Sequence, residues 1–324
     1  MNLQPQDTPL SLVHEEPLVN PAGGPRTVLE LIGNTPLIDL SALTRKESVK
    51  LFAKAEFLSP AGSVKDRAAL AMIQDAEDQG LLQPGTDRRI LDATSGNMGI
   101  ALAMVAAAKG YGVTLCLPSS ASQERKQVLK TYGAEVIYTD PMSGSDGAIR
   151  EARKLAAANP DRYVYVNQYG SEANWQAHYR TTGPEIWAQT RGALSHFITG
   201  LGTSGTFIGV GRYLRERNPE VRLISVQPDS PLHAIEGMKH METAIVPTIY
   251  DRTLADENWA IATDVAHAMV RRLASSCGLR LGVSAGANVA SAVRLAEQIH
   301  TGTIVTMLCD NADKYLSERF WDES

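Results

Sequence analysis

The feature that most constrains the fold of this chain is a repeated alternation of short apolar runs with segments of helical periodicity, which begins at Leu51. Short apolar runs bounded by turn residues predict buried strands, whereas apolar residues spaced three and four apart predict helices. Strands are predicted over Leu51–Ala55, Arg89–Ala93, Val113–Leu117, Glu135–Tyr138, Tyr163–Val166, His196–Thr199, Arg222–Val226 and Thr303–Leu308. Helices are predicted over Asp66–Gln79, Gly99–Lys109 and Gln123–Tyr132, each followed by a glycine that can end it. This alternation predicts an α/β fold with parallel sheets covered by helices on both faces, arranged as one barrel or as two sheets.

Length and composition exclude several classes of protein. The 324 residues are enough for about two domains, and a formal charge of −5 gives no sign of the basic surface of a nucleic-acid binder. No apolar stretch approaches the roughly 18 residues of a membrane span. Cys116, Cys277 and Cys309 are too widely spaced to predict a disulfide framework or a zinc site. We therefore expect a soluble, cytoplasmic protein without metal, nucleic-acid or membrane partners.

The first 28 residues differ from the rest of the chain. They contain five prolines, which interrupt regular helices. Residues 1–28 are therefore predicted to form a flexible N-terminal arm.

Two turns that join a predicted strand to a helix carry groups suited to bind anions. Thr94-Ser95-Gly96-Asn97-Met98-Gly99 follows one strand, and free backbone N–H groups at the start of the next helix favour a carboxylate or another anion. Gly200–Thr206 follows another strand, and its glycines and hydroxyls are suited to bind a phosphate. An ordinary capping turn or structural glycines are the alternatives for each turn alone.

A third segment, Ser63–Arg67, places Lys65 at the start of a predicted helix. The helix dipole disfavours a cation at this end and so favours the neutral amine. A neutral amine is the form that attacks carbonyl groups and makes Schiff bases. The alternative from this segment alone is a solvated lysine paired with Asp66.

Together and in this order, these segments resemble the cysteine synthase and cystathionine β-synthase family of fold-type II pyridoxal-phosphate enzymes. The resemblance covers roughly residues 29–318 and includes the blocks Leu31-Ile32-Gly33-Asn34-Thr35-Pro36-Leu37, Pro60-Ala61-Gly62-Ser63-Val64-Lys65-Asp66-Arg67, Asn167-Gln168-Tyr169, Thr182-Gly183-Pro184-Glu185-Ile186-Trp187 and Gly282-Val283-Ser284-Ala285-Gly286. It implies two doubly wound domains with mostly parallel sheets, similar to the β subunit of tryptophan synthase. The smaller, mobile domain would span residues 51–162, and the larger, phosphate-binding domain would span residues 29–50 and 163–324. A homodimer is implied in the same way.

The resemblance also implies roles for individual residues. Lys65 would hold pyridoxal 5'-phosphate as a Schiff base and act as the catalytic base. The remaining cofactor-binding positions are Asn97 at the ring oxygen, Ser284 at the pyridine nitrogen, and Gly202, Thr203, Ser204, Gly205 and Thr206 at the phosphate. The substrate-binding positions are Thr94, Ser95, Asn97, Met98 and Gln168. Met98 stands where the family usually has threonine, and Ser204 where it usually has glycine, so substrate identity is less firmly implied than cofactor binding.

The implied activity is a β-replacement in which sulfide displaces acetate from O-acetylserine to give cysteine. Four alternatives stay open: O-phosphoserine as substrate, thiosulfate or a thiocarboxylate as sulfur donor, cystathionine β-synthase-like activity, and a non-catalytic protein that binds a phosphate ligand. Serine/threonine dehydratases of the same fold are a runner-up among enzymes. Their lysine motif has a phenylalanine before the lysine, whereas this chain has Val64, which argues against that activity.

The leaving group is predicted from one further segment. The branch of the family that prefers O-phosphoserine is expected to have an arginine after the strand that corresponds to Arg222–Val226. Here the strand is followed by Gln227-Pro228-Asp229, and no arginine occurs between Arg222 and Arg252. Lys239 lies nearby in sequence but offers a point charge rather than a bidentate fork. We therefore expect O-acetylserine to be preferred over O-phosphoserine.

Overall fold

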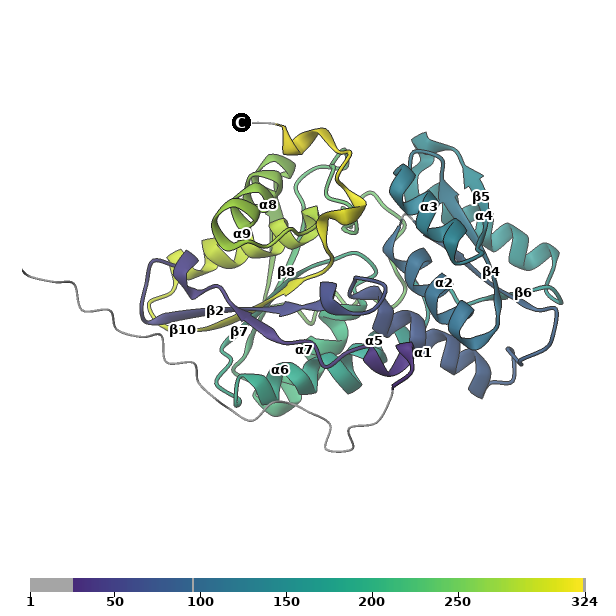
Figure 1. Ribbon diagram of the computed structural model, residues 1–324. Helices are drawn as coiled ribbons and strands as arrows, with labels where there is room; N and C mark the ends of the chain where they lie inside the picture. Colours follow the sequence, from purple (N-terminus) through teal and green to yellow (C-terminus); the bar gives the residue numbers. More distant parts are fainter. Residues whose placement is uncertain (1–25, 95, 323–324) are drawn as a thin grey trace, which may run out of the picture.

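Two sheets form the framework of the computed structural model, which describes residues 26–94 and 96–322 (Figure 1). The six-stranded sheet has the order β1-β2-β10-β7-β8-β9, and the four-stranded sheet has the order β5-β4-β3-β6. Every strand pair is parallel except β1 with β2. The predicted fold class, α/β with mostly parallel sheets, is confirmed, and the choice between a barrel and two sheets is settled as two sheets.

The elements follow the predicted alternation closely. The strands are β1 (Leu37–Asp39), β2 (Val49–Ala55), β3 (Arg89–Ala93), β4 (Gly112–Pro118), β5 (Glu135–Thr139), β6 (Tyr163–Tyr165), β7 (His196–Gly200), β8 (Arg222–Pro228), β9 (Glu257–Ile261) and β10 (Gly302–Leu308). The α-helices are α1 (Lys65–Asp78), α2 (Asn97–Lys109), α3 (Gln123–Thr131), α4 (Gly144–Ala158), α5 (Glu172–Ala177), α6 (Gly183–Gln189), α7 (Gly205–Arg217), α8 (Thr263–Cys277) and α9 (Val283–Gln298). Short helical turns are η1 (Val28–Leu31), η2 (Ser41–Leu43), η3 (Glu56–Leu58), η4 (Pro141–Ser143), η5 (His178–Thr182), η6 (Ala312–Lys314) and η7 (Arg319–Trp321). Each strand and helix with predicted bounds is present, and its ends differ from the prediction by at most two residues.

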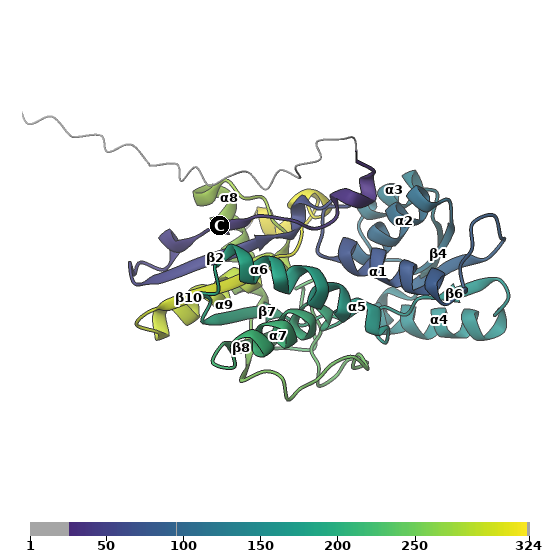
Figure 2. The same ribbon diagram turned by 90° about the horizontal axis from the view of Figure 1, so that it is seen from below.

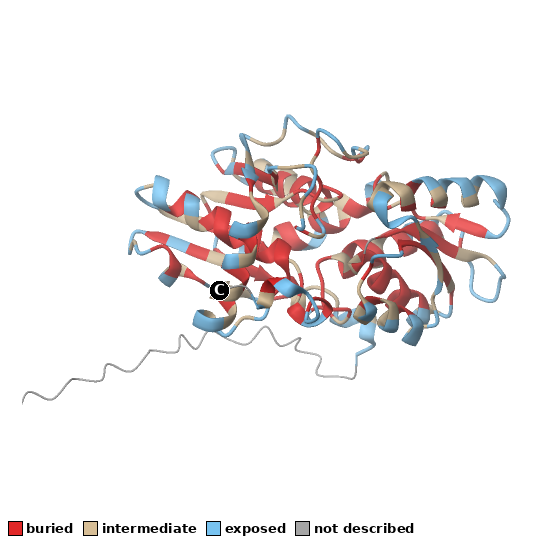
Figure 3. Cartoon of the chain, turned by 90° about the horizontal axis from the view of Figure 1, so that it is seen from above, coloured by how far each residue is buried: buried red, intermediate tan, exposed pale blue. Residues whose placement is uncertain are grey.

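Each sheet has its own apolar core. Ile90, Leu102 and Leu115 belong to the core of the four-stranded sheet, and the six-stranded sheet has one core on each face. Figure 3 shows buried residues along both sheets and on the inner sides of the helices, with exposed residues on their outer sides. The separate cores of the two sheets explain why the sequence contains two groups of strand and helix segments that each bury an apolar face.

Two strands lie across the predicted limits of the domains. β2, near residue 51, pairs with β10 in the six-stranded sheet, while β6, just after residue 162, pairs with β3 in the four-stranded sheet. A smaller domain defined by the four-stranded sheet would therefore begin after β2 and include β6. The division at 51–162 into a mobile and a larger domain stays a prediction. Residues 1–25 of the predicted arm lie outside the described residues.

The carboxyl ends of the central strands of both sheets point toward the region where the two sheets meet. The loops after β3 and β7 and the start of α1 all reach this region, and α1 packs beside α5 there (Figure 2). In parallel α/β sheets this end of the strands is where ligands bind. Along the described chain, no helix combines the length and apolarity that crossing a bilayer requires.

Candidate active site

A cavity lies between the two sheets, and it brings the predicted site residues together. It is lined by Lys65, Thr94, Asn97, Met98, Gln168, Gly202, Thr203, Ser204, Gly205, Thr206 and Ser284, among others. Ser95 lies outside the described residues. The three segments singled out in the sequence therefore meet at one place, although their roles toward a ligand remain predictions.

The loop between β7 and α7 is shaped so that its backbone borders the cavity. A Cβ added at Gly202 would overlap the carbonyl oxygen of Gly237, and one added at Gly205 would overlap the side chain of Asn174. Ser204 adopts a left-handed conformation with φ 68° immediately before α7. The 13-residue α7 therefore begins at the cavity, where its first N–H groups and its dipole favour an anion.

A buried histidine, His178, contacts the last residue of this loop segment, Thr206. The Nε2 atom of His178 lies 3.3 Å from Thr206 Oγ1, and its Nδ1 atom lies 2.9 Å from Thr182 Oγ1. Burial, together with the nearby charges of Arg67 and Lys65, lowers the pKa of His178 well below its ordinary value. The ring is therefore neutral and contacts one threonine as donor and the other as acceptor. The sequence analysis did not identify His178 as part of the site.

Lys65 is the first residue of α1 and borders the same cavity. Its backbone N–H donates to Ser63 Oγ at 3.3 Å, and the preceding N–H of Val64 donates to the carbonyl of Cys309 at 2.8 Å. Burial lowers the pKa of Lys65, although Cys309 and Asp310 act in the opposite direction. A lowered pKa increases the share of the neutral amine, which is the reactive form.

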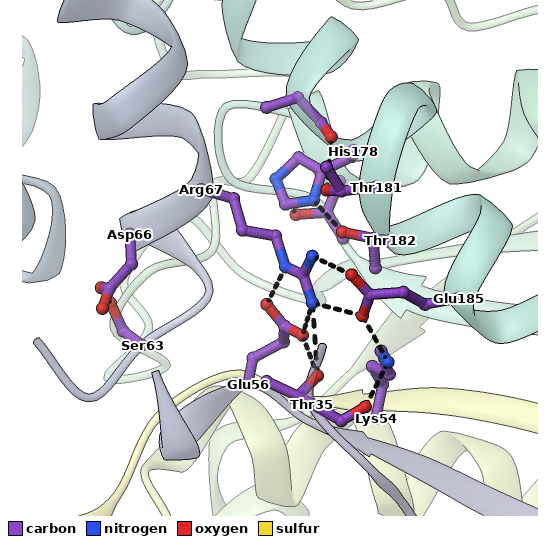
Figure 4. Close-up of polar contacts among 12 residues, drawn as sticks. Thr35, Lys54, Glu56, Ser63, Asp66, Arg67, His178, Thr181, Thr182 and Glu185 are labelled. Atoms are coloured by element: carbon purple, nitrogen blue, oxygen red, sulfur yellow. Dashed lines mark hydrogen bonds and ion pairs between the residues drawn. The ribbon is translucent and has the colours of Figure 1, made fainter. Parts of the chain in front are cut away.

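The helix that carries Lys65 is anchored by Arg67, whose guanidinium lies between two carboxylates (Figure 4). It donates to Glu56 through two hydrogen bonds of 2.8 Å and to Glu185 through hydrogen bonds of 2.7 and 2.8 Å. Lys54 Nζ lies 2.7 Å from Glu185 Oε2, and Thr35 Oγ1 donates to Glu56 Oε1 at 2.6 Å. Burial opposes ionisation of Glu185, but the hydrogen bonds and charge of Arg67 hold its pKa below the ordinary value. The network ties α1 to β2, η3 and α6, so it fixes the backbone at Lys65.

The turn after β3 is organised by Thr94. Its hydroxyl oxygen accepts hydrogen bonds from the N–H groups of Gly96 at 3.0 Å and Gly99 at 3.1 Å. Gln168 closes the turn from the β6 side, because its Nε2 atom donates to the carbonyl of Ala93 at 2.5 Å. Met98 borders the cavity and is buried in the apolar core of the four-stranded sheet. Apolar packing there accounts for methionine where the family usually has threonine.

Ser284, the second residue of α9, borders the same cavity. Its neighbour Cys309 is a free thiol whose pKa burial raises to about 11, against the lowering effects of Lys65 and of a hydrogen bond with Ser284. The thiol is therefore uncharged at neutral pH. Ser284 thus offers a hydroxyl beside an uncharged thiol.

Two ion pairs at the cavity join elements of the two sheets. Arg125 on α3 pairs with Glu236, and Lys239 Nζ lies 2.9 Å from Asp146 Oδ1 on α4. Arg125 also lies 4.8 Å above the centre of the Tyr315 ring. These residues come from segments without a recognisable motif, so the sequence analysis did not assign any of them to the site, and only Lys239 was considered near it.

The set of donors around the cavity does not resemble a metal centre. Within residues 26–94 and 96–322, no group of three or more histidine, cysteine, aspartate or glutamate side chains is arranged to hold a metal ion. What the cavity combines is an amine of lowered pKa, a helix N-terminus suited to a phosphate, and a hydroxyl at α9. The cradle that a Cβ at Gly202 would fill fits a phosphate group approached closely by backbone.

Comparisons with known proteins agree with this arrangement. The family model described as "Pyridoxal-phosphate dependent enzyme" matches residues 28–310. The chain is 44% identical over 304 residues to the cysteine synthase of Aquifex aeolicus, covering 92% of each protein. It is 41% identical over 297 residues to cysteine synthase B of Escherichia coli, covering 92% of this chain and 96% of that protein.

Solved structures give the same result. The fold is similar to that of an O-ureido-L-serine synthase, with a TM-score of 0.85 and 38% identity over 92% of this chain and 95% of that one. It is also similar to a cysteine synthase from Entamoeba histolytica, with a TM-score of 0.86 and 32% identity over 100% of this chain and 95% of that one. Both the sequence and the fold therefore match known proteins over nearly their whole length.

Proposed function

The chain belongs to the family of pyridoxal-phosphate dependent enzymes, and we propose that it is a cysteine synthase that replaces the acetate of O-acetylserine with sulfide. The products are cysteine and acetate. The proposal rests mainly on one observation: Lys65 and the loop after β7, whose backbone is suited to bind a phosphate, border the same cavity. The names of the related proteins, including the cysteine synthases of Aquifex aeolicus and Escherichia coli, support the same activity.

The residues around the cavity suit pyridoxal phosphate. The loop from Gly202 to Thr206 would hold the phosphate, Asn97 the ring oxygen and Ser284 the pyridine nitrogen, with Lys65 as the covalent anchor. When bound, the cofactor withdraws electrons from the α-carbon of an amino acid, which lets the β-substituent leave. The hydroxyl of Ser284 does not force a proton onto the nitrogen, which favours β-elimination over transamination.

The turn after β3 would hold the carboxylate of the substrate. α2 begins at Asn97 and runs for 13 residues, so its dipole favours an anion at this turn. Thr94 accepts two backbone hydrogen bonds and Gln168 donates one to Ala93, so both side chains have fixed places at the edge of the cavity. Such prior ordering lowers the entropy cost of binding the substrate in a reactive position.

Lys65 would move the proton of the reaction. Its lowered pKa favours the neutral amine, which would accept the α-proton of the substrate. The Arg67 network fixes the start of α1, so the backbone from which the Lys65 amine extends is held in place.

The charges at the cavity favour a substrate whose β-substituent is uncharged, such as an acetyl ester. Lys239, the cation considered as a replacement for the missing arginine, is held by Asp146 at 2.9 Å and Ser145 at 3.4 Å. Arg125 is likewise paired, with Glu236. A doubly charged phosphate ester would have to compete with these carboxylates for the cations, whereas an acetyl ester would not.

We also propose that the protein acts in the cytoplasm as a homodimer. The free thiols of Cys116, Cys277 and Cys309 support a reducing compartment. The family resemblance supports the dimer, which size-exclusion chromatography with light scattering would test. Either a monomeric or a larger species would contradict it.

The proposed activity is tested with purified protein reconstituted with pyridoxal phosphate. Cysteine formation is measured with O-acetylserine or O-phosphoserine as substrate, and with sulfide or thiosulfate as sulfur donor. The expected result is the highest kcat/KM for O-acetylserine with sulfide. A preference for O-phosphoserine that is lost in Lys239→Ala would overturn the leaving-group assignment. A protein that binds phosphate ligands but forms no product with any pair would be a binding protein instead.

A further inference from the structure

Asp310 lies two residues after the end of β10, and its side chain is fully buried where the two sheets meet. The backbone is held from two sides. Gly282 N–H donates to the carbonyl of Asp310 at 3.1 Å, and Asp310 forms an isolated β-bridge with Ser63. These contacts join the end of β10 to the segments just before α9 and α1. The carboxyl of Asp310 is therefore fixed relative to the cavity by the backbone on which it sits.

The carboxyl group uses one oxygen for two hydrogen bonds. Its Oδ2 atom accepts from Asn97 Nδ2 at 2.7 Å and from the hydroxyl of Tyr315 at 2.6 Å. Its Oδ1 atom is buried and has no hydrogen-bond partner among the described residues. A side chain at position 282 would overlap the carboxyl group, so Gly282 provides the room that it occupies. A carboxylate only accepts, and hydrogen bonds to it are stronger than those between neutral groups.

The hydrogen bond with Asp310 determines the orientation of the Asn97 side-chain amide. An asparagine amide can present either its NH₂ group or its oxygen to a neighbour. Because Asp310 accepts, the NH₂ end faces it, and one N–H of that group remains for another partner. Asn97 borders the cavity, and its Oδ1 atom is buried without a partner among the described residues. The second N–H is therefore the donor that Asn97 can offer to a ligand.

We propose that Asp310 is a positioning residue that orients the Asn97 amide so that its NH₂ group, rather than its oxygen, meets the ring oxygen of pyridoxal phosphate. The proposal rests on the proposed function, because it requires Asn97 to contact the cofactor. A serine or asparagine at position 310 would not impose this orientation, since each can donate as well as accept. Asn97 begins α2 beside the four-stranded sheet, whereas Asp310 lies two residues after β10 of the six-stranded sheet, so the contact also fixes Asn97 across the junction of the sheets.

The test is a double-mutant cycle on cofactor affinity. The full-length protein is freed of cofactor and titrated with pyridoxal phosphate, and binding is followed by absorbance and fluorescence. Asp310→Asn, nearly equal in size, should weaken binding about tenfold, which corresponds to about 1.4 kcal/mol. Asn97→Ala should weaken it at least as much, and the double variant should bind no more weakly than Asn97→Ala alone. The absorbance band of the bound cofactor should move in the same direction in both single variants.

Tyr315→Phe is the matched control, because it removes the other hydrogen bond to the same oxygen and leaves the Asn97 contact. It should weaken cofactor binding less than about threefold. Losses that add in the double variant, or unchanged affinity in Asp310→Asn, would show that Asp310 does not act through Asn97. Thermal unfolding of each cofactor-free variant identifies one that does not fold, and Asp310→Ser then takes the place of Asp310→Asn in the cycle.

Failure of the Asp310 proposal can be distinguished from failure of the proposed cysteine synthase activity. A wild-type protein that binds the cofactor but makes no cysteine would refute the activity while the cycle still decides the role of Asp310. A wild-type protein that does not bind the cofactor would overturn both.

Discussion

Replacing Arg67 with methionine should strongly destabilise the protein, because it leaves two carboxylates facing each other in the interior. The side chain of Glu56 is fully buried and that of Glu185 is 15% exposed. Four hydrogen bonds of 2.7 to 2.8 Å would be lost. Removing one partner of a buried ion pair costs about 3 to 5 kcal/mol. Lys54 stays beside Glu185, so we expect Glu56 to carry most of the cost, and a decrease of about 4 kcal/mol in the free energy of unfolding at pH 7.

The pH dependence provides a second measurement of the same effect. In the wild type the lowered pKa of Glu185 gives stability that is present above its unfolded pKa and is lost only as the pH falls through its lower folded pKa. Between pH 7 and pH 5 the wild type therefore keeps this contribution. In Arg67→Met the stranded carboxyls take up protons over the same range, which removes the buried charge. The difference in the free energy of unfolding between the wild type and Arg67→Met should therefore become smaller toward pH 5.

Urea unfolding followed by circular dichroism measures both effects. The control is Arg222→Met, which breaks an exposed pair with Glu257 at 3.2 Å and should cost at most about 1 kcal/mol. The double variant Arg67→Met with Glu56→Gln should recover part of the loss, because it removes the stranded charge. An Arg67→Met variant no less stable than Arg222→Met, or a loss that does not depend on pH, would refute the reasoning.

Three further predictions concern Lys65, Gly202 and Asp66. Lys65→Ala should abolish cysteine formation and the visible absorbance of the bound cofactor with an unchanged circular dichroism spectrum, because one amine is both anchor and base; retained turnover would contradict this. Gly202→Ala should lower the cofactor content of the purified protein at least about tenfold, because the added Cβ meets the carbonyl oxygen of Gly237. Gly211→Ala, whose Cβ meets only leucine side chains at 3.2 Å, should not lower it. Equal cofactor contents in the two variants would count against a phosphate site at Gly202. Burial raises the pKa of Asp66 to about 7, so ionisation of Asp66 destabilises the wild-type fold increasingly as the pH rises from 4 to 7. The unfolding temperature of Asp66→Asn should therefore rise relative to that of the wild type over this range. A difference in unfolding temperature that stays constant with pH would disprove the prediction.

Prediction from sequence succeeded where the informative residues are neighbours in the chain. The turn at Asn97, the turn at Gly202 and the helix start at Lys65 each combine several such residues after a strand or before a helix, and all three border the cavity. β1 and β9 were not predicted. β1 has only three residues, and β9 has four of its five residues at least partly exposed, so neither shows a clear apolar run.

Residues that reach the site singly could not be predicted in this way. Asp310, Arg125 and His178 come from three separate segments, and each has a partner far away in the sequence that only tertiary packing brings into contact. A single aspartate after an apolar strand is typical of many turns, and a single arginine on a helix is typical of an exposed face. Their burial, which makes their contacts strong, depends on how the two sheets meet rather than on the local sequence.

The position of β10 has a consequence for the order in which the protein is assembled on the ribosome. All strands of the four-stranded sheet lie within residues 89–165, so that sheet can pair as soon as this stretch has emerged. The six-stranded sheet cannot, because its last strand, Gly302–Leu308, inserts between β2 and β7. Until then β2 and β7 each expose an unpaired edge, which is a site for aggregation. A nascent chain from which β9 but not yet β10 has emerged therefore holds one finished sheet and two separate parts of the other. Release at this stage should leave a product that chaperones retain.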